Sequence, residues 1–383
     1  MNIAIIGTAY PYRGGIATYN ERLAAEFQDQ GHEVTIFTFT KQYPDFLFPG
    51  KTQYSEEDGP RDIKIVRCIN SINPLNWITV GNRIKNTKPD LVVIGFWLPL
   101  MGPCFGQILR RIKKNGHSIV LSILHNVIPH ESRLGDRLFT GYFAKAVDGF
   151  VAMAQNVMDD IKTFDTTHPK ILSPHPIYDN FGTVMPREEA LSKLGLAADY
   201  NYILFFGLIR KYKGLDLLIE AFANEQFRNS NIRLIIAGEY YSDKDEYIHL
   251  INKYSLEDEV IQVDQFIPNS EVQYYFNACD LVVQPYRTAT QSGVTQIAYH
   301  FNKPMIVTNV GGLEKMCPHG KVGYVVTTNP DDIADSIFKF FNKTDKPKMI
   351  NNIIEEKKKY SWDILTQNML ELFEKVNIYS NDK

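Results

Sequence analysis

Residues 205–222 read FFGLIRKYKGLDLLIEAF, and this stretch sets the fold class of the chain. Its apolar start predicts a strand that ends at Gly207, and its periodic end predicts an amphipathic helix. Between them, Arg210, Lys211 and Lys213 stand beside the helix N-terminus. Free backbone N–H groups and the helix dipole favour an anion there, most simply a phosphate. The alternative is an ordinary strand-to-helix connection whose lysines face water.

The same order of strand, loop and helix recurs on both sides of this stretch. Apolar residues at helical spacing predict a helix over Gly15–Gln30, and glycines end this helix and a second one over Gly106–Asn115. The alternation predicts parallel sheets covered by helices on both faces. The predicted strands are Asn2–Ile6, Glu33–Phe39, Lys64–Val66, Leu91–Gly95, Ile119–Leu124, Gly149–Ala152, Ile171–Leu172, Tyr202–Phe206, Arg233–Ala237, Glu259–Gln262, Leu281–Gln284, Met305–Thr308 and Gly323–Val326.

A chain of 383 residues is too long for one ordinary core, so we expect two domains. The segment Ser173–Arg187 is rich in proline and has little periodicity, which is typical of a linker. The sequence thus predicts an α/β protein with two Rossmann-like lobes, over residues 1–180 and 187–360. Ligands of such sheets bind at the carboxyl ends of the strands, so the cleft between the lobes is the expected site.

Composition narrows the class of protein further. The formal net charge is -3 and the pI about 6.3, which gives no reason to expect a nucleic-acid partner. The four cysteines lie far apart, as in a reduced cytosolic protein. Met1–Gly7 reads as a buried strand and not as a signal peptide, and glycines and prolines interrupt the apolar run Leu91–Gly106. We therefore expect a cytoplasmic protein.

Two strand ends of the first lobe carry candidate site residues. Gly14 and Gly15 precede a helix and allow close approach of a ligand to the backbone, although a tight turn explains them equally well. They do not form the GxGxxG pattern of a nicotinamide site. His125, His130 and Glu131 follow an apolar strand, where histidine can bind a hydroxyl or a phosphate. Their irregular loop gives no fixed geometry for a metal ion, and we predict no metal site.

Three strand ends of the second lobe carry polar or glycine-containing loops. The loop over residues 285–296 is rich in hydroxyl and amide groups, which suit a diphosphate or a ribose, although a capped polar loop is the alternative. The predicted donor-binding residues of this lobe are Gly207, Gly238, Phe266, Ile267, Gln291, Ser292, Gly293, Val294 and Gln296.

Taken in order, these motifs resemble the retaining glycosyltransferases of the GT-B fold, in family four (glycosyl transferases group one). The resemblance covers nearly the whole chain. It rests on Arg13–Gly15, His125–Asn126, Gly207 with Lys213–Asp216, Lys303–Thr308 with Gly311–Glu314, and Ser361–Trp362. It implies that the second lobe binds a nucleotide sugar, that Gly14 and Gly15 approach its phosphates, and that the acceptor lies on the first lobe. It also implies that a terminal helix over residues 361–383 packs back on the first lobe.

The chain departs from the family pattern at two places. The arginine that usually follows the first glycine is replaced by Leu208, and Arg210 lies two residues further on. The positions of the family's paired glutamates are occupied by Ala289 and Ile297, so that Gln291 and Gln296 are the expected replacements.

The resemblance implies transfer of a sugar with retention, without metal or cofactor, from a UDP- or GDP-linked donor. Arg210 and Lys213 would stabilise the leaving diphosphate, and His125 would orient the sugar. Trp97, His130 and Glu131 would line the side of a glycan or lipid-linked acceptor, as in bacterial surface polysaccharide and lipopolysaccharide synthesis. The basic helix end with Arg110, Arg111, Lys113 and Lys114 would allow peripheral contact with the inner face of the plasma membrane. The alternatives are a non-catalytic GT-B partner protein and a sugar-nucleotide epimerase.

Overall fold

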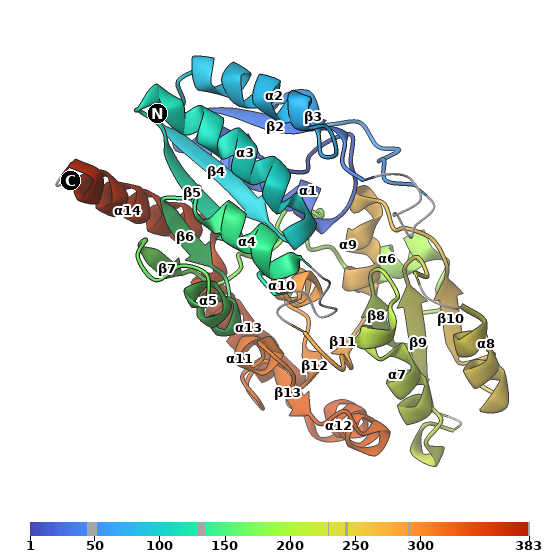
Figure 1. The fold of residues 1–383 in the computed structure, drawn as a ribbon. Coiled ribbons are helices and arrows are strands. Elements are labelled where there is room, and N and C mark those ends of the chain that lie inside the picture. Colours follow the sequence, from blue (N-terminus) through green and yellow to red (C-terminus); the bar gives the residue numbers. More distant parts are fainter. Residues whose placement is uncertain (44–51, 129–134, 229, 242–243, 290–291, 382–383) are drawn as a thin grey trace. The chain divides into compact units, whose positions relative to one another are not determined.

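The computed structural model describes residues 1–383 except 44–51, 129–134, 229, 242–243, 290–291 and 382–383 (Figure 1). The chain forms two compact units, and each is described by itself. Unit 1 comprises Met1–Pro176 together with Tyr360–Lys383, and unit 2 comprises Ile177–Lys359. The chain therefore crosses between the units twice.

Unit 1 is built on a parallel sheet whose described strands run in the order β3-β2-β1-β4-β5-β6-β7. Every residue of β4 and β5 is buried, as expected for central strands covered on both faces. The strand order changes direction between β1 and β4, which makes their carboxyl ends the expected ligand edge. The strands are β1 (Asn2–Ile6), β2 (Glu33–Lys41), β3 (Lys64–Asn70), β4 (Leu91–Phe96), β5 (Ile119–Leu124), β6 (Gly149–Ala152) and β7 (Lys170–Leu172).

The helices of unit 1 largely follow the sequence pattern, with one correction. The helix expected over Gly106–Asn115 begins at Gly102, because Pro103 occupies its first turn, where a missing N–H breaks no helical hydrogen bond. It ends in a 3₁₀ turn over Lys113–Asn115. The helices are α1 (Gly15–Asp29), α2 (Pro74–Asn86), α3 (Gly102–Ile112), α4 (Asp136–Ala144), α5 (Gln155–Lys162) and α14 (Trp362–Asn381).

Helix α14 comes from the end of the chain but packs within unit 1, on α1 and on β5, β6 and β7. One face of the helix is buried there, where its side chains recur at helical spacing. Gly149 of β6 leaves room for this face, since a Cβ on it would lie 3.2 Å from Val376 Cγ2 and 3.3 Å from Leu372 Cδ2. Among the described side chains of α14, the buried ones are Trp362, Leu365, Thr366, Met369, Leu372 and Val376.

Unit 2 repeats the architecture with a parallel sheet in the order β10-β9-β8-β11-β12-β13. Its switch of direction lies between β8 and β11. Helix α12 is capped at its N-terminus, because the Asn329 side chain accepts from the N–H of Asp331 and Pro330 opens the helix. The strands are β8 (Asn201–Phe206), β9 (Ile232–Ala237), β10 (Val260–Val263), β11 (Leu281–Gln284), β12 (Met305–Thr308) and β13 (Gly323–Val326). The helices are α6 (Arg187–Leu194), α7 (Leu215–Phe222), α8 (Lys244–Lys253), α9 (Asn269–Ala278), α10 (Gly293–His300), α11 (Leu313–Met316), α12 (Pro330–Lys343) and α13 (Lys346–Glu356).

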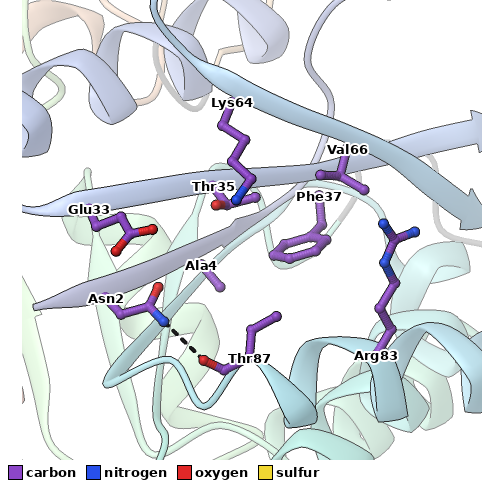
Figure 2. A pocket seen from close by; sticks show the side chains of 9 residues that line it. All are labelled: Asn2, Ala4, Glu33, Thr35, Phe37, Lys64, Val66, Arg83 and Thr87. Carbon is purple, nitrogen blue, oxygen red and sulfur yellow. Dashed lines mark hydrogen bonds between the residues drawn. The ribbon is translucent and has the colours of Figure 1, made fainter.

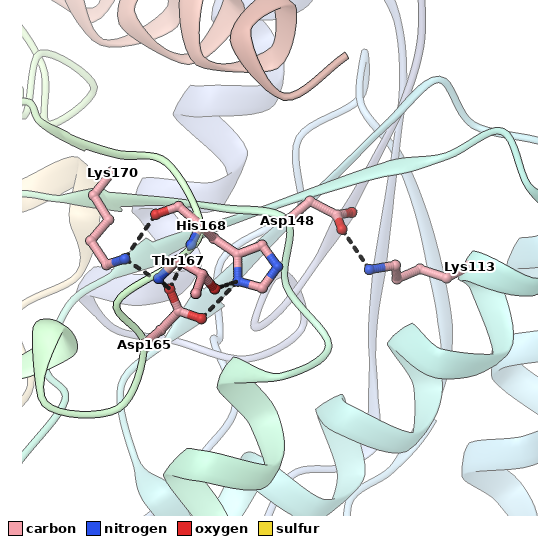
Figure 3. A network of polar contacts seen from close by, with 6 residues as sticks. All are labelled: Lys113, Asp148, Asp165, Thr167, His168 and Lys170. Carbon is pink, nitrogen blue, oxygen red and sulfur yellow. Dashed lines mark hydrogen bonds and ion pairs between the residues drawn. The ribbon is translucent and has the colours of Figure 1, made fainter. Parts of the chain in front are cut away.

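Ion pairs hold the amino edge of the unit 1 sheet, where β6 and β7 begin (Figure 3). Asp165 accepts hydrogen bonds from Lys170 Nζ at 2.8 Å and from the N–H of His168 at 2.9 Å. Burial raises the pKa of Asp165, but the bonds from Lys170 and His168 outweigh it and lower the pKa to about 2. Asp148 pairs with Lys113 and accepts from the N–H of Val120. This edge is thus fixed by structural pairs.

A cavity of about 150 Å³ opens at the amino ends of β1, β2 and β3, beside the end of α2 (Figure 2). The strand register places Ala4 beside Thr35 and Phe37 beside Val66 on one face of the sheet, which forms its floor. Because the cavity lies at the amino ends of the strands, it is at the opposite edge from the predicted ligand site.

Candidate functional site

Two loops meet at the switch point of unit 2, one after β8 and one after β11. The N–H of Arg287 donates to the carbonyl oxygen of Tyr212 at 2.7 Å, and its guanidinium pairs with Asp216 at the start of α7. A Cβ on Gly214 would lie 2.0 Å from the carbonyl oxygen of Pro285. The two loops therefore pack as one layer at the carboxyl edge of the sheet.

Lys213 lies at the centre of this layer. Its Nζ atom is 3.1 Å from the position that a Cβ on Gly207 would take, and Val294 Cγ2 is 3.8 Å from the same point. The ammonium also lies 5.7 Å from the ring centroid of Tyr286. Burial, and then the nearby charge of Arg210, lower the pKa of Lys213 to about 7. A bound diphosphate would favour the charged form and supply the partner that this lysine needs.

The other cations of the loop have different surroundings. Arg210 is exposed, and its guanidinium lies 5.2 Å from the ring centroid of Tyr241. Lys211 forms an ion pair of 3.1 Å with Glu246 of α8. The structure therefore brings Lys213 and Gly207 together, with Arg210 near enough to influence Lys213 electrostatically, while Lys211 is tied to a neighbouring helix.

Gln284, at the end of β11, organises the second loop and was missed by sequence reasoning. Its Oε1 accepts from the hydroxyls of Ser292 at 2.7 Å and Thr295 at 3.0 Å. Ser292 Oγ also lies 3.4 Å from Tyr286 Oη. A buried amide that closes an otherwise apolar strand, Leu281–Gln284, was the signal that could have revealed this residue.

Helix α10 begins directly after this network. A Cβ on Gly293 would lie 2.9 Å from Tyr178 Cε2, so a larger residue has no room there. Gln296 is fully buried, and within the described part of the chain neither of its amide atoms has a hydrogen-bond partner. A buried amide of this kind suits a polar ligand or an ordered water. Gln291 lies outside the described residues.

The remaining predicted residues of unit 2 follow strands other than β8, the strand that precedes Lys213. A Cβ on Gly238 would lie 2.1 Å from the carbonyl oxygen of Gly207, so Gly238 keeps the ends of β8 and β9 in contact. Phe266 and Ile267 follow β10, which is separated from β8 by β9.

In unit 1, the glycine pair begins α1 as predicted. Gly14 has a φ of 107°, and of the described atoms none lies within 4 Å of the position of its Cβ. No acidic residue occupies the first turn of α1, and the N-cap residue Gly14 has no side chain that could cap it. An anion can therefore approach the start of this helix.

His125 follows β5 at the same carboxyl edge. Its N–H donates to Phe96 O at 2.9 Å, and its Nε2 is 3.3 Å from the position of a Cβ on Gly95. Burial, and then the nearby charge of His175, lower the pKa of His125 to about 3. An exposed histidine titrates near neutrality, but this imidazole is neutral at physiological pH and acts as a hydrogen-bonding group.

The predicted acceptor residues are described only in part. The indole N–H of Trp97 donates to Tyr43 Oη at 2.8 Å, and its ring packs on Phe39 and Phe105. Trp97 is thus partly buried and packs against the hydrophobic core of unit 1. His130 and Glu131 lie outside the described residues.

Two cations of the basic end of α3, Arg110 and Lys113, form bonds within the unit. Arg110 donates to the carbonyl oxygens of Gly106 and Tyr142 and stacks on the Tyr142 ring, and Lys113 pairs with Asp148. Over the part of the chain that the structure covers, none of the helices is both apolar and long enough to span a bilayer.

Comparison with known proteins identifies the class of protein that these two sheets define. Residues 186–359 match the family described as glycosyl transferases group 1, and residues 13–172 match that described as glycosyltransferase family 4. The chain is a glycosyltransferase with the GT-B fold. It belongs to the group 1 glycosyl transferases.

Individual proteins agree with this classification. The chain is 24% identical to an uncharacterized glycosyltransferase of Methanocaldococcus jannaschii over 98% of this chain and 99% of that protein. It is 25% identical to a lipopolysaccharide 1,2-N-acetylglucosaminetransferase of Salmonella typhimurium, over 48% of this chain and 50% of that protein. A solved structure of Anabaena HepE in complex with UDP superimposes with a TM-score of 0.72 at 16% identity, covering 98% of this chain and 100% of that chain.

Proposed function

We propose that the chain transfers a sugar, with retention and without a metal ion, from a UDP- or GDP-linked donor to a glycan or lipid-linked acceptor. The observation that carries this proposal is the buried ammonium of Lys213, beside Gly207 at the switch point of unit 2. A buried cation at a strand end needs an anionic partner, and a diphosphate supplies one. The UDP held by the HepE structure supports the choice of donor.

The proposed reaction follows from the charges that develop. The bond between the anomeric carbon and the diphosphate oxygen breaks, so the sugar gains positive charge and the diphosphate negative charge. Lys213, Arg210 and the backbone N–H groups near Ser292 and Gly293 stabilise the diphosphate. The acceptor oxygen bonds to the anomeric carbon on the face that the diphosphate leaves, and its proton passes to a phosphate oxygen. Neutral His125 hydrogen-bonds the transferred sugar.

The acceptor class and the setting are part of the same proposal. The similarity to a lipopolysaccharide glycosyltransferase supports a role in bacterial surface polysaccharide synthesis, at the cytoplasmic side of the membrane. Peripheral membrane contact stays a prediction, and the internal bonds of Arg110 and Lys113 leave these cations less available for it.

Donor binding is tested with a matched pair of lysine variants. Lys213→Ala removes the buried ammonium and should weaken nucleotide binding by about 1.5–3 kcal/mol, or roughly 10- to 150-fold. Lys211→Ala is the control, because this lysine lies in the same loop but pairs with Glu246. Titration calorimetry with UDP, GDP, ADP and CMP and their sugars measures the affinities of both variants. Equal affinities of Lys213→Ala and wild type would contradict the assignment of Lys213 to the diphosphate.

The reaction itself is tested with the donor so identified. NMR of the product shows whether the anomeric configuration of the donor is retained. Full turnover in the presence of a chelator would show that the reaction needs no metal ion. The buried apolar residues Ala289 and Ile297, where the family resemblance places glutamates, favour the non-catalytic alternative. Turnover of any nucleotide sugar excludes that alternative, and product formation without an acceptor would indicate an epimerase.

A further inference from the structure

A cluster of rings surrounds Tyr19 of α1 inside unit 1. The Tyr19 ring centroid lies 5.0 Å from that of His125, 5.3 Å from that of His175 and 5.0 Å from that of Trp362. Tyr19 is fully buried, and its hydroxyl lies 3.5 Å from Met153 Sδ. Four segments that are far apart in the sequence, around residues 19, 125, 175 and 362, thus meet at one tyrosine.

The partners of Tyr19 include residues next to both chain crossings. Unit 1 ends at Pro176 and resumes at Tyr360. His175 directly precedes the first crossing, and its Nδ1 lies 2.7 Å from the carbonyl oxygen of Pro176. Trp362 follows the second crossing by two residues and is buried, with the guanidinium of Arg22 lying 5.2 Å from its ring centroid. Tyr19 therefore contacts a residue beside each crossing, His175 at the first and Trp362 at the second.

The contact between Tyr19 and His125 is edge-on, with an interplanar angle of 83°. The side of His125 that bears Nε2 faces Gly95, close to Asn20 Oδ1, which lies 3.9 Å from the same Cβ position. Asn20 is itself held, because its amide donates to the carbonyl oxygen of Thr8 at 2.8 Å. The neighbouring residues Tyr19 and Asn20 thus contact or approach the imidazole from α1.

We propose that Tyr19 is a positioning residue, which fixes the imidazole of His125 and joins it to both segments that cross between the units. The ring of Tyr19, and not its hydroxyl, carries this role, since the contacts to His125, His175 and Trp362 are ring contacts. The catalytic consequence rests on the proposed function of His125, whereas the positioning itself does not.

Steady-state kinetics on the full chain tests the catalytic consequence. Tyr19→Leu should lower kcat by about 10- to 100-fold, because small displacements of a reacting group cost this much. Affinity for the free nucleotide, whose diphosphate the proposed function assigns to Lys213 in unit 2, should stay within about twofold. Tyr19→Phe keeps the ring and should restore kcat to within about threefold of wild type. A Tyr19→Leu enzyme with unchanged kcat, or a Tyr19→Phe enzyme as slow as Tyr19→Leu, would overturn the proposal.

A double-mutant cycle separates positioning from general loss of structure. In a His125→Ala background, Tyr19→Leu should cost less than about twofold more in kcat, since the group that it positions is gone. A full second loss in that background would show that Tyr19 acts otherwise. If Tyr19→Leu does not fold, as judged by circular dichroism, His175→Leu takes its place in the cycle with the same expectation.

An NMR measurement keeps the proposal distinct from the function of His125. If His125→Ala retains full turnover, the proposed role of His125 fails, but the position of its ring can still be observed. The imidazole resonances of His125 should shift in Tyr19→Leu and stay near their wild-type positions in Tyr19→Phe, because the adjacent ring shields them. Unshifted resonances in Tyr19→Leu would refute the positioning directly.

Discussion

Lys211 and Lys213 stand two residues apart in one loop and have opposite surroundings. Lys211 is exposed and paired with Glu246, whereas Lys213 is buried above Gly207. The local pattern placed both beside an anion site, and the family resemblance assigned the diphosphate to Lys213 and not to Lys211. The 3₁₀ turn over Lys211–Lys213 decides which side chain points inward, and it forms because the loop packs against the segment after β11.

The lowered pKa of Lys213 predicts a pH-dependent donor affinity. With a pKa of about 7, the amine is charged below neutrality and neutral above it. The diphosphate prefers the charged form, so the dissociation constant of a nucleotide sugar should rise about tenfold from pH 6 to pH 8. A nucleotide sugar is the right probe because its diphosphate has no proton that titrates in this range.

Calorimetry in buffers of different ionisation enthalpy measures the number of protons that the protein takes up when the nucleotide sugar binds. Above pH 7, wild-type protein should take up a proton on binding, and Lys213→Gln should take up none from this site. An affinity that does not change over this pH range in wild type would mean that Lys213 does not contact the donor.

At the scale of elements, glycines decide whether neighbouring loops can meet. Gly214 has a φ of 65° and lies against the carbonyl oxygen of Pro285. Gly195 at the end of α6 has a φ of 66°, but of the described atoms none lies within 4 Å of its Cβ position. The two residues therefore share the backbone conformation and differ in the space around them.

Substitution of Gly195 and of Gly214 by alanine should separate the energetic cost of backbone strain from the cost of steric overlap. Gly195→Ala should lower the stability by roughly 1–2 kcal/mol, because alanine adopts the left-handed conformation unfavourably. Gly214→Ala should cost clearly more and also weaken nucleotide binding, because a backbone carbonyl cannot move aside as a flexible side chain can. Denaturant unfolding and nucleotide titration measure both effects, and equal costs at the two sites would contradict the packing of the two loops.

The boundaries of strands and helices show where local sequence patterns were sufficient to predict the structure. Strands such as Ile119–Leu124 were predicted to the residue, because short apolar runs between turn signals are unambiguous in a parallel sheet. Helix α3 was predicted to start four residues too late, since Gly102 and Pro103 read as breakers although a first turn accepts them. Gln284 was read as a strand end, because its partners Ser292 and Thr295 lie beyond a loop.

At the scale of the whole molecule, α14 makes unit 1 depend on the last residues of the chain. Its buried face packs on α1 and on strands of unit 1. Unit 2, over Ile177–Lys359, contains none of this helix. A change in the buried face of α14 should therefore act on one unit.

Leu365→Ala tests this dependence. Leu365 is fully buried, so its truncation should destabilise unit 1 by about 2–5 kcal/mol. Ile378→Ala on the exposed side of the helix is the control and should cost less than about 0.5 kcal/mol. Calorimetric unfolding should show one transition lowered by Leu365→Ala and another unchanged, and a uniform shift of all unfolding would argue against independent units.

The sequence by itself determined two parallel sheets, the loops at their carboxyl ends and the cationic stretch over residues 205–222. These follow from local patterns, because apolar runs, glycines and helix caps act within a few residues of the chain. Only the tertiary structure decided that Lys213 is the buried cation and that Tyr19 gathers His125, His175 and Trp362. Parallel strands are joined by long crossovers, so residues that share a sheet edge come from distant parts of the sequence, and their contacts leave no local signal.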